Sequence, residues 1–339
     1  MPEPVTHASL KGYNTFGLDV YADRFVPIAT LEEAREVLQD ERFRQLPRLV
    51  LGGGSNILFT RDFHGLVVLN LISGISVIRE DDTHVFVRAG AGENWHHFVR
   101  HTVEHGWGGL ENLSLIPGTV GAAPIQNIGA YGVEIKDTFN ELEALDLSDG
   151  STRTFSAADC AFGYRDSIFK GAEKGRYLIT HVTFRLAKKP VINTRYGAIE
   201  QELKEMGVAN PGIREVSEAV IRIRRSKLPD PAMIGNAGSF FKNPEVPEAV
   251  YHSLKASYPD LPGYNAGPGR IKLAAGYLIE KCGWKGKVVG HVGMHEKQAL
   301  VLVNHGGATG SELIEHARRV QTSVVDTFGV ELEMEVNIL

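Results

Sequence analysis

The sequence predicts an α+β fold in at least two parts, because a strand-rich texture gives way to a helix-rich one along the chain. Residues 14 to about 190 hold many short apolar runs typical of strands, with a few helices between them. From about Lys188 onward helical periods dominate, which predicts a separate α+β domain. The chain has 339 residues, 43% of them hydrophobic and 23% charged, so two or three globular domains can form.

The first part carries clear signals for its helices and strands. Thr30 and Glu33 form a capping-box pattern that predicts a helix through about Gln39. The expected buried face of this helix comprises Leu31, Ala34, Val37 and Leu38. The predicted strands are residues 48–51, 65–71, 84–89, 142–147, 152–155 and 177–186, with residues 148–151 as the turn of a hairpin.

A second helix is predicted to start near Asn94. His97, His101 and His105 recur on it at one-turn spacing, which raises the question of a metal site. Its apolar stripe comprises Trp95, Phe98, Val99, Thr102 and Val103. This stripe leaves the histidines on the flank or the solvent side, so no metal site is predicted.

In the second part, proline and glycine mark where the predicted helices end. One helix is expected to stop at Leu228-Pro229, another to span residues 271–282, and a third to end at Gly329. A strand is predicted at residues 299–304.

Composition excludes several classes of function. A net charge of −5 argues against general nucleic-acid binding. The longest apolar runs, such as Leu66–Ile72, fall far short of the ~20 residues of a membrane-spanning helix. Cys160 and Cys282 are too few for a disulfide framework or a cysteine-based zinc site. We expect a cytoplasmic monomer that does not associate with membranes.

Two glycine-rich loops predict close backbone contact with an extended ligand. Residues 52–56 follow a predicted strand, and their consecutive N–H groups can form an anion nest for a pyrophosphate. Residues 114–132 are rich in glycine, which lets the backbone lie against a flat ligand. Neither a Rossmann fingerprint nor a P-loop is present. A dinucleotide is predicted, with a plain glycine-rich connector as the alternative for each loop.

Several blocks occur in the order found in one enzyme family. They are residues 14–17, 52–56, 114–132, 162–167, 227–231, 238–244 and 333–336. On these blocks the chain resembles the UDP-N-acetylenolpyruvoylglucosamine reductases, or MurB family, flavoproteins of peptidoglycan precursor synthesis. The resemblance covers nearly the whole chain. Tyr196 and residues 295–304 resemble the type I subclass, in which a tyrosine-bearing loop covers the substrate.

The resemblance implies an FAD-binding unit of the vanillyl-alcohol oxidase type, made of two α+β subdomains, and a C-terminal α+β substrate-binding domain. The expected bounds are 1–72 and 73–212 for the subdomains, 213–328 for the substrate domain, and 329–339 for a strand returning to the active site. The implied reaction is the NADPH-dependent reduction of UDP-N-acetylglucosamine enolpyruvate to UDP-N-acetylmuramate through FAD.

The family pattern implies which residues bind the cofactor. Its pyrophosphate is expected on the first glycine loop and its flavin on the second. The implied residues are Gly52, Gly53, Gly54, Ser55, Asn56, Ile116, Pro117, Gly118, Gly121, Ala122, Ile125 and Gly129, with Arg224 as a weaker candidate for the FAD diphosphate or the substrate. Some members carry hydroxyl residues where this chain has Ala122 and Ala123, so only backbone contacts are expected there.

The family motif also maps onto three catalytic residues. The implied hydride goes to the β-carbon of the enolpyruvyl group, and negative charge spreads into the substrate carboxylate. Arg165 and Glu335 are expected to hold and polarise that carboxylate, and Ser239 to protonate the α-carbon. From the residues alone, Arg165 also fits a surface partner of Asp166, and Ser239 a loop-capping hydroxyl.

Glu335 lies in a predicted closing strand, residues 330–338, whose apolar residues alternate with polar ones. The pattern places it on one face with Glu331 and Glu333, which by itself indicates a solvated side chain. The family match implies the opposite. An anionic Glu335 would repel the substrate carboxylate, so its implied role requires it to be protonated or bridged to a cation.

Four residues match positions that bind the UDP-sugar in the family: Tyr196, Lys227, Asn243 and Gln298. Lys227 supplies positive charge for a diphosphate in an acidic protein. Alternatively, it is a helix-terminal lysine that complements the helix dipole.

Two other functions are compatible with the same residues. One is an FAD-dependent alcohol or sugar oxidase of the same flavin fold, which would be reoxidised rapidly by air. The other is a non-catalytic nucleotide-binding or scaffold protein, which would lack yellow absorbance and take up no FAD.

Overall fold

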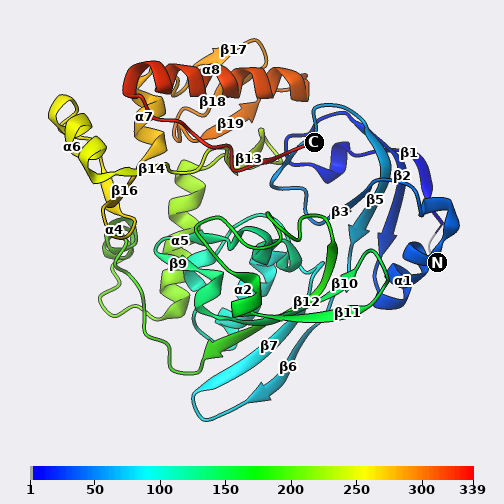
Figure 1. Cartoon of the computed structure of the whole chain (residues 1–339). Helices are drawn as coiled ribbons and strands as arrows, with labels where there is room; N and C mark the ends of the chain where they lie inside the picture. The colour runs from blue at the N-terminus through cyan, green and yellow to red at the C-terminus, as the bar shows by residue number, and fades with distance from the viewer. Residues whose placement is uncertain (1–2) are drawn as a thin grey trace. The chain divides into compact units, whose positions relative to one another are not determined.

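The computed structural model describes residues 3–339, which divide into two compact units. Unit 1 comprises the described residues up to Ala8, Ala22–Gly54 and Phe63–Ser226. Unit 2 comprises Ser9–Tyr21, Ser55–Asp62 and Lys227–Leu339. Both contain helices and sheets (Figure 1), so the expected α+β class is confirmed. The expected division into four parts stays a prediction.

A four-stranded sheet of unit 1 has the order β1-β2-β5-β3. Its strands are β1 (Val5–Ser9), β2 (Tyr21–Ile28), β5 (Phe63–Asn70) and β3 (Arg48–Leu51). Strands β2 and β3 both run parallel to β5. Helix α1 (Leu31–Gln39) starts where predicted, because the Thr30 side chain accepts a hydrogen bond from the Glu33 backbone. Its buried Ala34 and Val37 join the core beneath the sheet.

A five-stranded antiparallel sheet of unit 1 has the order β11-β10-β12-β7-β6. Its strands are β11 (Thr152–Ser156), β10 (Phe139–Asp146), β12 (Tyr177–Ala187), β7 (His84–Gly90) and β6 (Ile75–Glu80). Helix α2 (Trp95–Glu104) packs on it, with the Trp95 ring edge-on to Phe184 of β12 at 5.8 Å. The whole predicted apolar stripe of this helix is buried.

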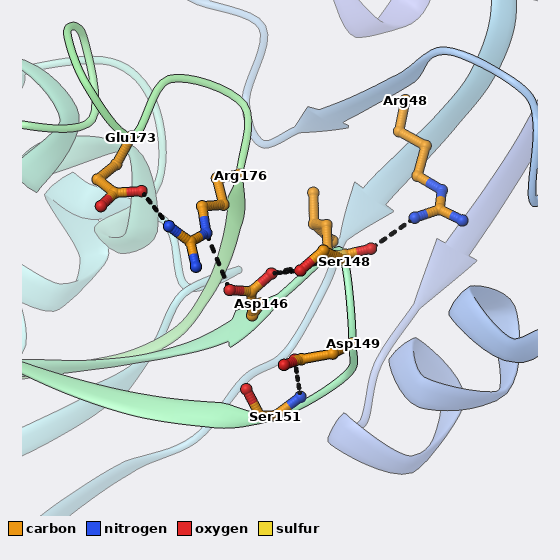
Figure 2. Close-up of polar contacts among 8 residues, drawn as sticks. Arg48, Asp146, Ser148, Asp149, Ser151, Glu173 and Arg176 are labelled. Carbon is orange, nitrogen blue, oxygen red and sulfur yellow. Dashed lines mark hydrogen bonds and ion pairs between the residues drawn. The ribbon is translucent and has the colours of Figure 1, made fainter.

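One hydrophobic core joins the two sheets of unit 1, since Leu145 and Leu178 pack with Val26 of β2 and the α1 residues. The hairpin turn after β10 is tied down by polar contacts (Figure 2). Arg48 donates to the Leu147 carbonyl at 2.7 Å, and Asp146 accepts from Ser148 and Arg176. The predicted hairpin is thus confirmed and anchored to β3.

The remaining elements of unit 1 are short or lie near its C-terminal end. Helix α4 (Gly197–Glu205) and helix α5 (Ile213–Lys227) pack through a small core of their own. The others are α3 (Ala157–Cys160), β8 (Gly129–Ala130), β9 (Val133–Glu134) and the 3-10 helices η2 (Glu41–Phe43), η3 (Glu111–Leu113), η4 (Val120–Gln126) and η5 (Ile135–Asp137).

Unit 2 contains an antiparallel sheet in the order β13-β19-β18-β17 and a three-stranded sheet in the order β14-β16-β15. The first consists of β13 (Gly235–Ser239), β19 (Val301–Asn304), β18 (Val292–Met294) and β17 (Val288–Val289). The second consists of β14 (Glu245–Pro247), β16 (Arg270–Leu273) and β15 (Gly263–Asn265). Its helices are α6 (Glu248–Ser257), α7 (Ala275–Lys281), α8 (Gly310–Phe328) and the 3-10 helix η1 (Lys11–Tyr13).

Two segments from early in the chain belong to unit 2. Asn304 donates from its side chain to the Phe16 carbonyl at 2.9 Å. Strand β4 (Ile57–Leu58) pairs in parallel with β20 (Asn337–Ile338). Gly310, at the start of α8, lies so close to the Phe59 carbonyl that no Cβ fits. Residues separated by most of the sequence therefore build one core.

Two predicted elements are wrong in part. Residues 271–282 were expected as one helix, but Arg270–Leu273 is strand β16 and the helix begins at Ala275, because the segment pairs on both sides with β14 and β15. Residues 330–338 were expected as one strand, but only Asn337–Ile338 forms a ladder, and Met334 makes an isolated bridge with Phe241. No helix within residues 3–339 is long and apolar enough to cross a membrane.

Candidate functional site

The two glycine loops meet in unit 1. A Cβ atom at Gly53 would lie 3.0 Å from the Gly118 Cα, and one at Gly52 would overlap the Thr119 hydroxyl. Gly118 has a φ of +113°, which L side chains rarely adopt. Glycine is therefore required at Gly52 and Gly53 because the two loops touch each other there, whatever ligand they bind.

The first loop presents unused hydrogen-bond donors. Within residues 3–339, the backbone N–H groups of Gly53 and Ser55 have no acceptor. Gly54, between them, has a left-handed φ of +59°. Successive N–H groups around a left-handed residue form the concave arrangement that binds anions. The local backbone fits the pyrophosphate expected from the sequence.

The second loop is held against the segment between β7 and α2. The N–H groups of Val120 and Gly121 donate to the carbonyls of Glu93 and Ala91, and Gly118 accepts from Trp95. Gly121 lies so close to Ala91 that a side chain cannot fit. The predicted lining residues Ile116, Ala122 and Ile125 are half-buried and Pro117 is exposed. The loop thus leaves apolar surface open to a flat ligand.

Leu115, just before this loop, is clamped by side chains from two helices. It has a left-handed φ of +59°. The Nδ1 atom of His96 in α2 accepts from its N–H at 2.9 Å, and the Nε atom of Arg224 in α5 donates to its carbonyl at 3.2 Å. Burial and neighbouring cations lower the pKa of His96 to about 4, so the imidazole is neutral near pH 7.

Arg165 occupies a tight turn of residues 163–166 with a φ of +53°. Its guanidinium donates to the Gly129 carbonyl at 2.5 Å. Burial lowers the pKa of Arg224, a hydrogen bond with Tyr131 opposes this, and repulsion from Arg165 lowers it further. Tyr131 also meets the Tyr196 ring edge-on at 5.3 Å. Unit 1 therefore gathers two predicted site residues, Arg224 and Tyr196, around Tyr131, and a third, Arg165, acts electrostatically on Arg224.

Unit 2 brings together the other two predicted catalytic residues. Ser239 is the last residue of β13 and pairs with Val301. Phe240 follows Ser239, and its carbonyl accepts a hydrogen bond from the backbone N–H of Glu335 at 2.8 Å. The Asn56 side chain donates to the Glu335 carbonyl at 3.4 Å. Glu335 is half-buried, whereas Glu331 and Glu333 are exposed. Glu335 is therefore less exposed than alternation alone indicates, and its catalytic role stays a prediction.

The remaining predicted substrate residues have local structural partners. The side-chain oxygen of Asn243 accepts from the Ala275 N–H at 2.9 Å, at the start of α7. The Gln298 side-chain oxygen accepts from the Leu300 N–H at 3.4 Å. Lys227 is the exposed last residue of α5. Within residues 3–339, the side-chain NH₂ groups of Asn243 and Gln298 have no hydrogen-bond partner.

Sequence reasoning missed His96 and the role of Tyr131. The histidine lies two residues after the Asn94 helix cap, outside the one-turn series of His97, His101 and His105. No local sequence pattern identifies its role, because its hydrogen-bond partner Leu115 is 19 residues away and is brought near only by the fold. No group of three potential metal ligands occurs within residues 3–339.

Two family models match the chain. Residues 22–156 match the FAD binding domain, and residues 230–339 match the C-terminal domain of UDP-N-acetylenolpyruvoylglucosamine reductase. The cofactor class and the second domain expected from the sequence blocks are thereby confirmed.

Similar proteins agree with these models. The UDP-N-acetylenolpyruvoylglucosamine reductase of Burkholderia lata is 50% identical, covering 99% of both chains, and that of Chromobacterium violaceum is 53% identical, covering 97% of both. The crystal structure of the enzyme from Thermus caldophilus has a TM-score of 0.69 at 25% identity and covers 100% of this chain and 98% of its own. With this identity along nearly its whole length and both domains in place, the chain belongs to the UDP-N-acetylenolpyruvoylglucosamine reductase family.

Proposed function

We propose that this chain reduces UDP-N-acetylglucosamine enolpyruvate to UDP-N-acetylmuramate with NADPH and FAD, a step of peptidoglycan precursor synthesis. The names of its relatives supply the substrate. The observation that carries the proposal is the pair of guanidinium groups, Arg165 and Arg224, which repel each other in unit 1.

These two cations disfavour each other, because repulsion from Arg165 lowers the pKa of Arg224. An anionic group bound beside them removes that repulsion and forms charge-assisted hydrogen bonds. The whole chain carries a net charge of −5, so anions must be attracted by such local cations. The substrate supplies a carboxylate and a diphosphate.

When bound, FAD supplies a hydride, taken from NADPH, to the enolpyruvyl β-carbon. Arg165 is proposed to hold the substrate carboxylate as negative charge develops on it, and the Gly129 carbonyl orients the guanidinium. Glu335 shares this task in a protonated or cation-bridged form. Ser239 donates the proton to the α-carbon, because the intermediate is basic enough to take it from a hydroxyl.

The proposed cofactor contacts follow from the two loops. Residues 52–56 hold the pyrophosphate through N–H groups, and residues 116–129 line the flavin and ribityl chain. Arg224 is a weaker candidate for the FAD diphosphate or the substrate, and it is held beside the second loop by its hydrogen bond to the Leu115 carbonyl. Tyr196, Lys227, Asn243 and Gln298 are proposed to bind the UDP-sugar, with Tyr196 on a covering loop.

We further propose that the protein acts as a monomer in the cytoplasm. Cys160 and Cys282 are both free thiols, which fits a reducing compartment. Size-exclusion chromatography with light scattering tests the first point, and cell fractionation tests the second.

The direct test is to incubate the purified, FAD-loaded protein with NADPH and UDP-N-acetylglucosamine enolpyruvate and to detect UDP-N-acetylmuramate by mass. Ser239→Ala should leave flavin bleaching by NADPH nearly unchanged and slow reoxidation by the substrate by at least ~100-fold. Ser239→Cys should retain more activity than Ser239→Ala. Rapid reoxidation by air without product would instead indicate an oxidase.

A further inference from the structure

Leu115 is a branched residue in a conformation that favours glycine, and it immediately precedes the proposed flavin-lining residues. Its φ of +59° is therefore maintained by its surroundings. Both of its backbone polar groups are held by side chains: the N–H by His96 and the carbonyl by Arg224. These side chains come from different helices, so the conformation of Leu115 depends on how α2 and α5 pack.

The hydrogen bond from Leu115 specifies the state of the imidazole. An N–H donor needs a bare Nδ1 atom, so His96 must be neutral with any ring proton on Nε2. The charged and titratable groups facing His96 are Arg100, His97, Arg225 and Arg224. All of them are basic, so they favour the neutral form that the contact requires.

We propose that His96 is a positioning residue for the cofactor loop: as a hydrogen-bond acceptor it holds Leu115 left-handed and thereby sets the path of Ile116 to Gly118. This inference rests on the proposed placement of the flavin against that loop. Protonation of Nδ1 breaks the contact and adds a cation beside Arg224, so acid should loosen the loop.

The test compares three substitutions by FAD affinity, measured through quenching of flavin fluorescence without NADPH or substrate. The Asn side-chain oxygen occupies the position of Nδ1 and does not titrate, so His96→Asn should stay within about threefold of wild type at pH 7.5. The oxygen of His96→Gln lies one bond farther out, and His96→Leu offers no acceptor. Both should bind FAD about tenfold more weakly, as expected for one lost hydrogen bond.

Two further readouts separate positioning from a general loss of structure. Amide hydrogen exchange of a peptide containing Leu115 should be slow in wild type and His96→Asn and fast in His96→Gln, with equal melting temperatures for all three. Between pH 7 and pH 4, wild type should lose more FAD affinity than His96→Asn.

The proposal is overturned if folded His96→Gln binds FAD as wild type does, or if His96→Asn and wild type weaken in parallel in acid. It is also overturned if wild type binds no FAD, and in that case the proposed function fails as well. If FAD binds normally but no UDP-N-acetylmuramate forms, only the proposed function fails.

Discussion

Arg165 has a left-handed backbone conformation, with a φ of +53°, which L residues rarely adopt. A left-handed residue other than glycine costs ~1–2 kcal/mol, and the backbone pairing of Gly163 with Asp166 maintains it. Such strain persists where the surrounding structure over-determines it, and it gathers at functional sites. The alternative that Arg165 is merely a surface partner of Asp166 does not account for its bond to Gly129.

This strain leads to a prediction for Arg165→Asn. Asparagine tolerates the left-handed region, so the free energy of unfolding should stay within about 1 kcal/mol of wild type. The lost cation should lower kcat/KM by ~100- to 1,000-fold. Thermal melts and steady-state kinetics measure the two effects. A variant that is strongly destabilised, or fully active, would contradict the role given to Arg165.

Substitutions can distinguish the role of Glu335 from those of Glu331 and Glu333, which the sequence pattern places on the same face. Glu335→Gln keeps part of the hydrogen bonding and should retain more turnover than Glu335→Ala. Glu331→Ala and Glu333→Ala should be nearly silent, because both carboxylate side chains are exposed, including that of Glu333 in its ion pair with Lys242. Melting temperatures serve as the control. If all three alanine variants turn over like wild type, the catalytic assignment of Glu335 should be withdrawn.

At the scale of elements, the contact between the two glycine loops is the feature most sensitive to a single atom. Gly53→Val would press a branched side chain against the Gly118 backbone, 3.0 Å from where its Cβ begins. We expect the loops to separate and FAD retention after desalting to fall by about tenfold or more. Gly12→Val is the matched control, because nothing lies within 4 Å of where its Cβ would be. Stoichiometric FAD in folded Gly53→Val would contradict this placement.

Sequence signals located the elements whose cause is local. Thr30 caps α1, and Gly329 ends α8 with a φ of +64°. The errors lie where a distant partner decides. Residues 270–273 become a strand because β14 and β15 flank them, and the closing segment has too few partners to form a long ladder.

The candidate site follows the same division. The glycine loops and Arg165 are recognisable as motifs, because each needs particular residue types within a few positions. The clamp on Leu115 is not, since it depends on His96 and Arg224 from two separate helices. The half-burial of Glu335 also comes from tertiary structure, through the Phe240 carbonyl and Asn56.

At the scale of the whole molecule, a buried histidine in unit 2 makes stability depend on pH. Burial and nearby cations lower the pKa of His316 to about 4, and within residues 3–339 its Nε2 atom has no hydrogen-bond partner. The unfolded chain binds this proton near pH 6.5 and the folded chain only near pH 4, so stability falls as the pH drops across that window.

The test is His316→Gln, which removes the titration. Between pH 6.5 and pH 4, its melting temperature should fall less than that of wild type. The loss of unfolding free energy over this range should be smaller in the variant by at most on the order of 2 to 3 kcal/mol. His252→Gln is the control, because that side chain is exposed. Equal acid sensitivity in wild type and His316→Gln would show that other groups control the effect.

The interleaving of the two units has a consequence for how the protein is made. The chain leaves the ribosome from its N-terminus. The Phe16 carbonyl accepts a hydrogen bond from Asn304, which lies 288 residues later, and the Asn56 carbonyl accepts one from Asn337, which lies 281 residues later. Phe16 and Phe59, both buried in the finished protein, therefore emerge long before Phe240 and Gly310, which they contact. Unit 2 can complete its core only after Asn337 and Ile338 have left the ribosome, so its early apolar segments stay exposed to aggregation during most of synthesis.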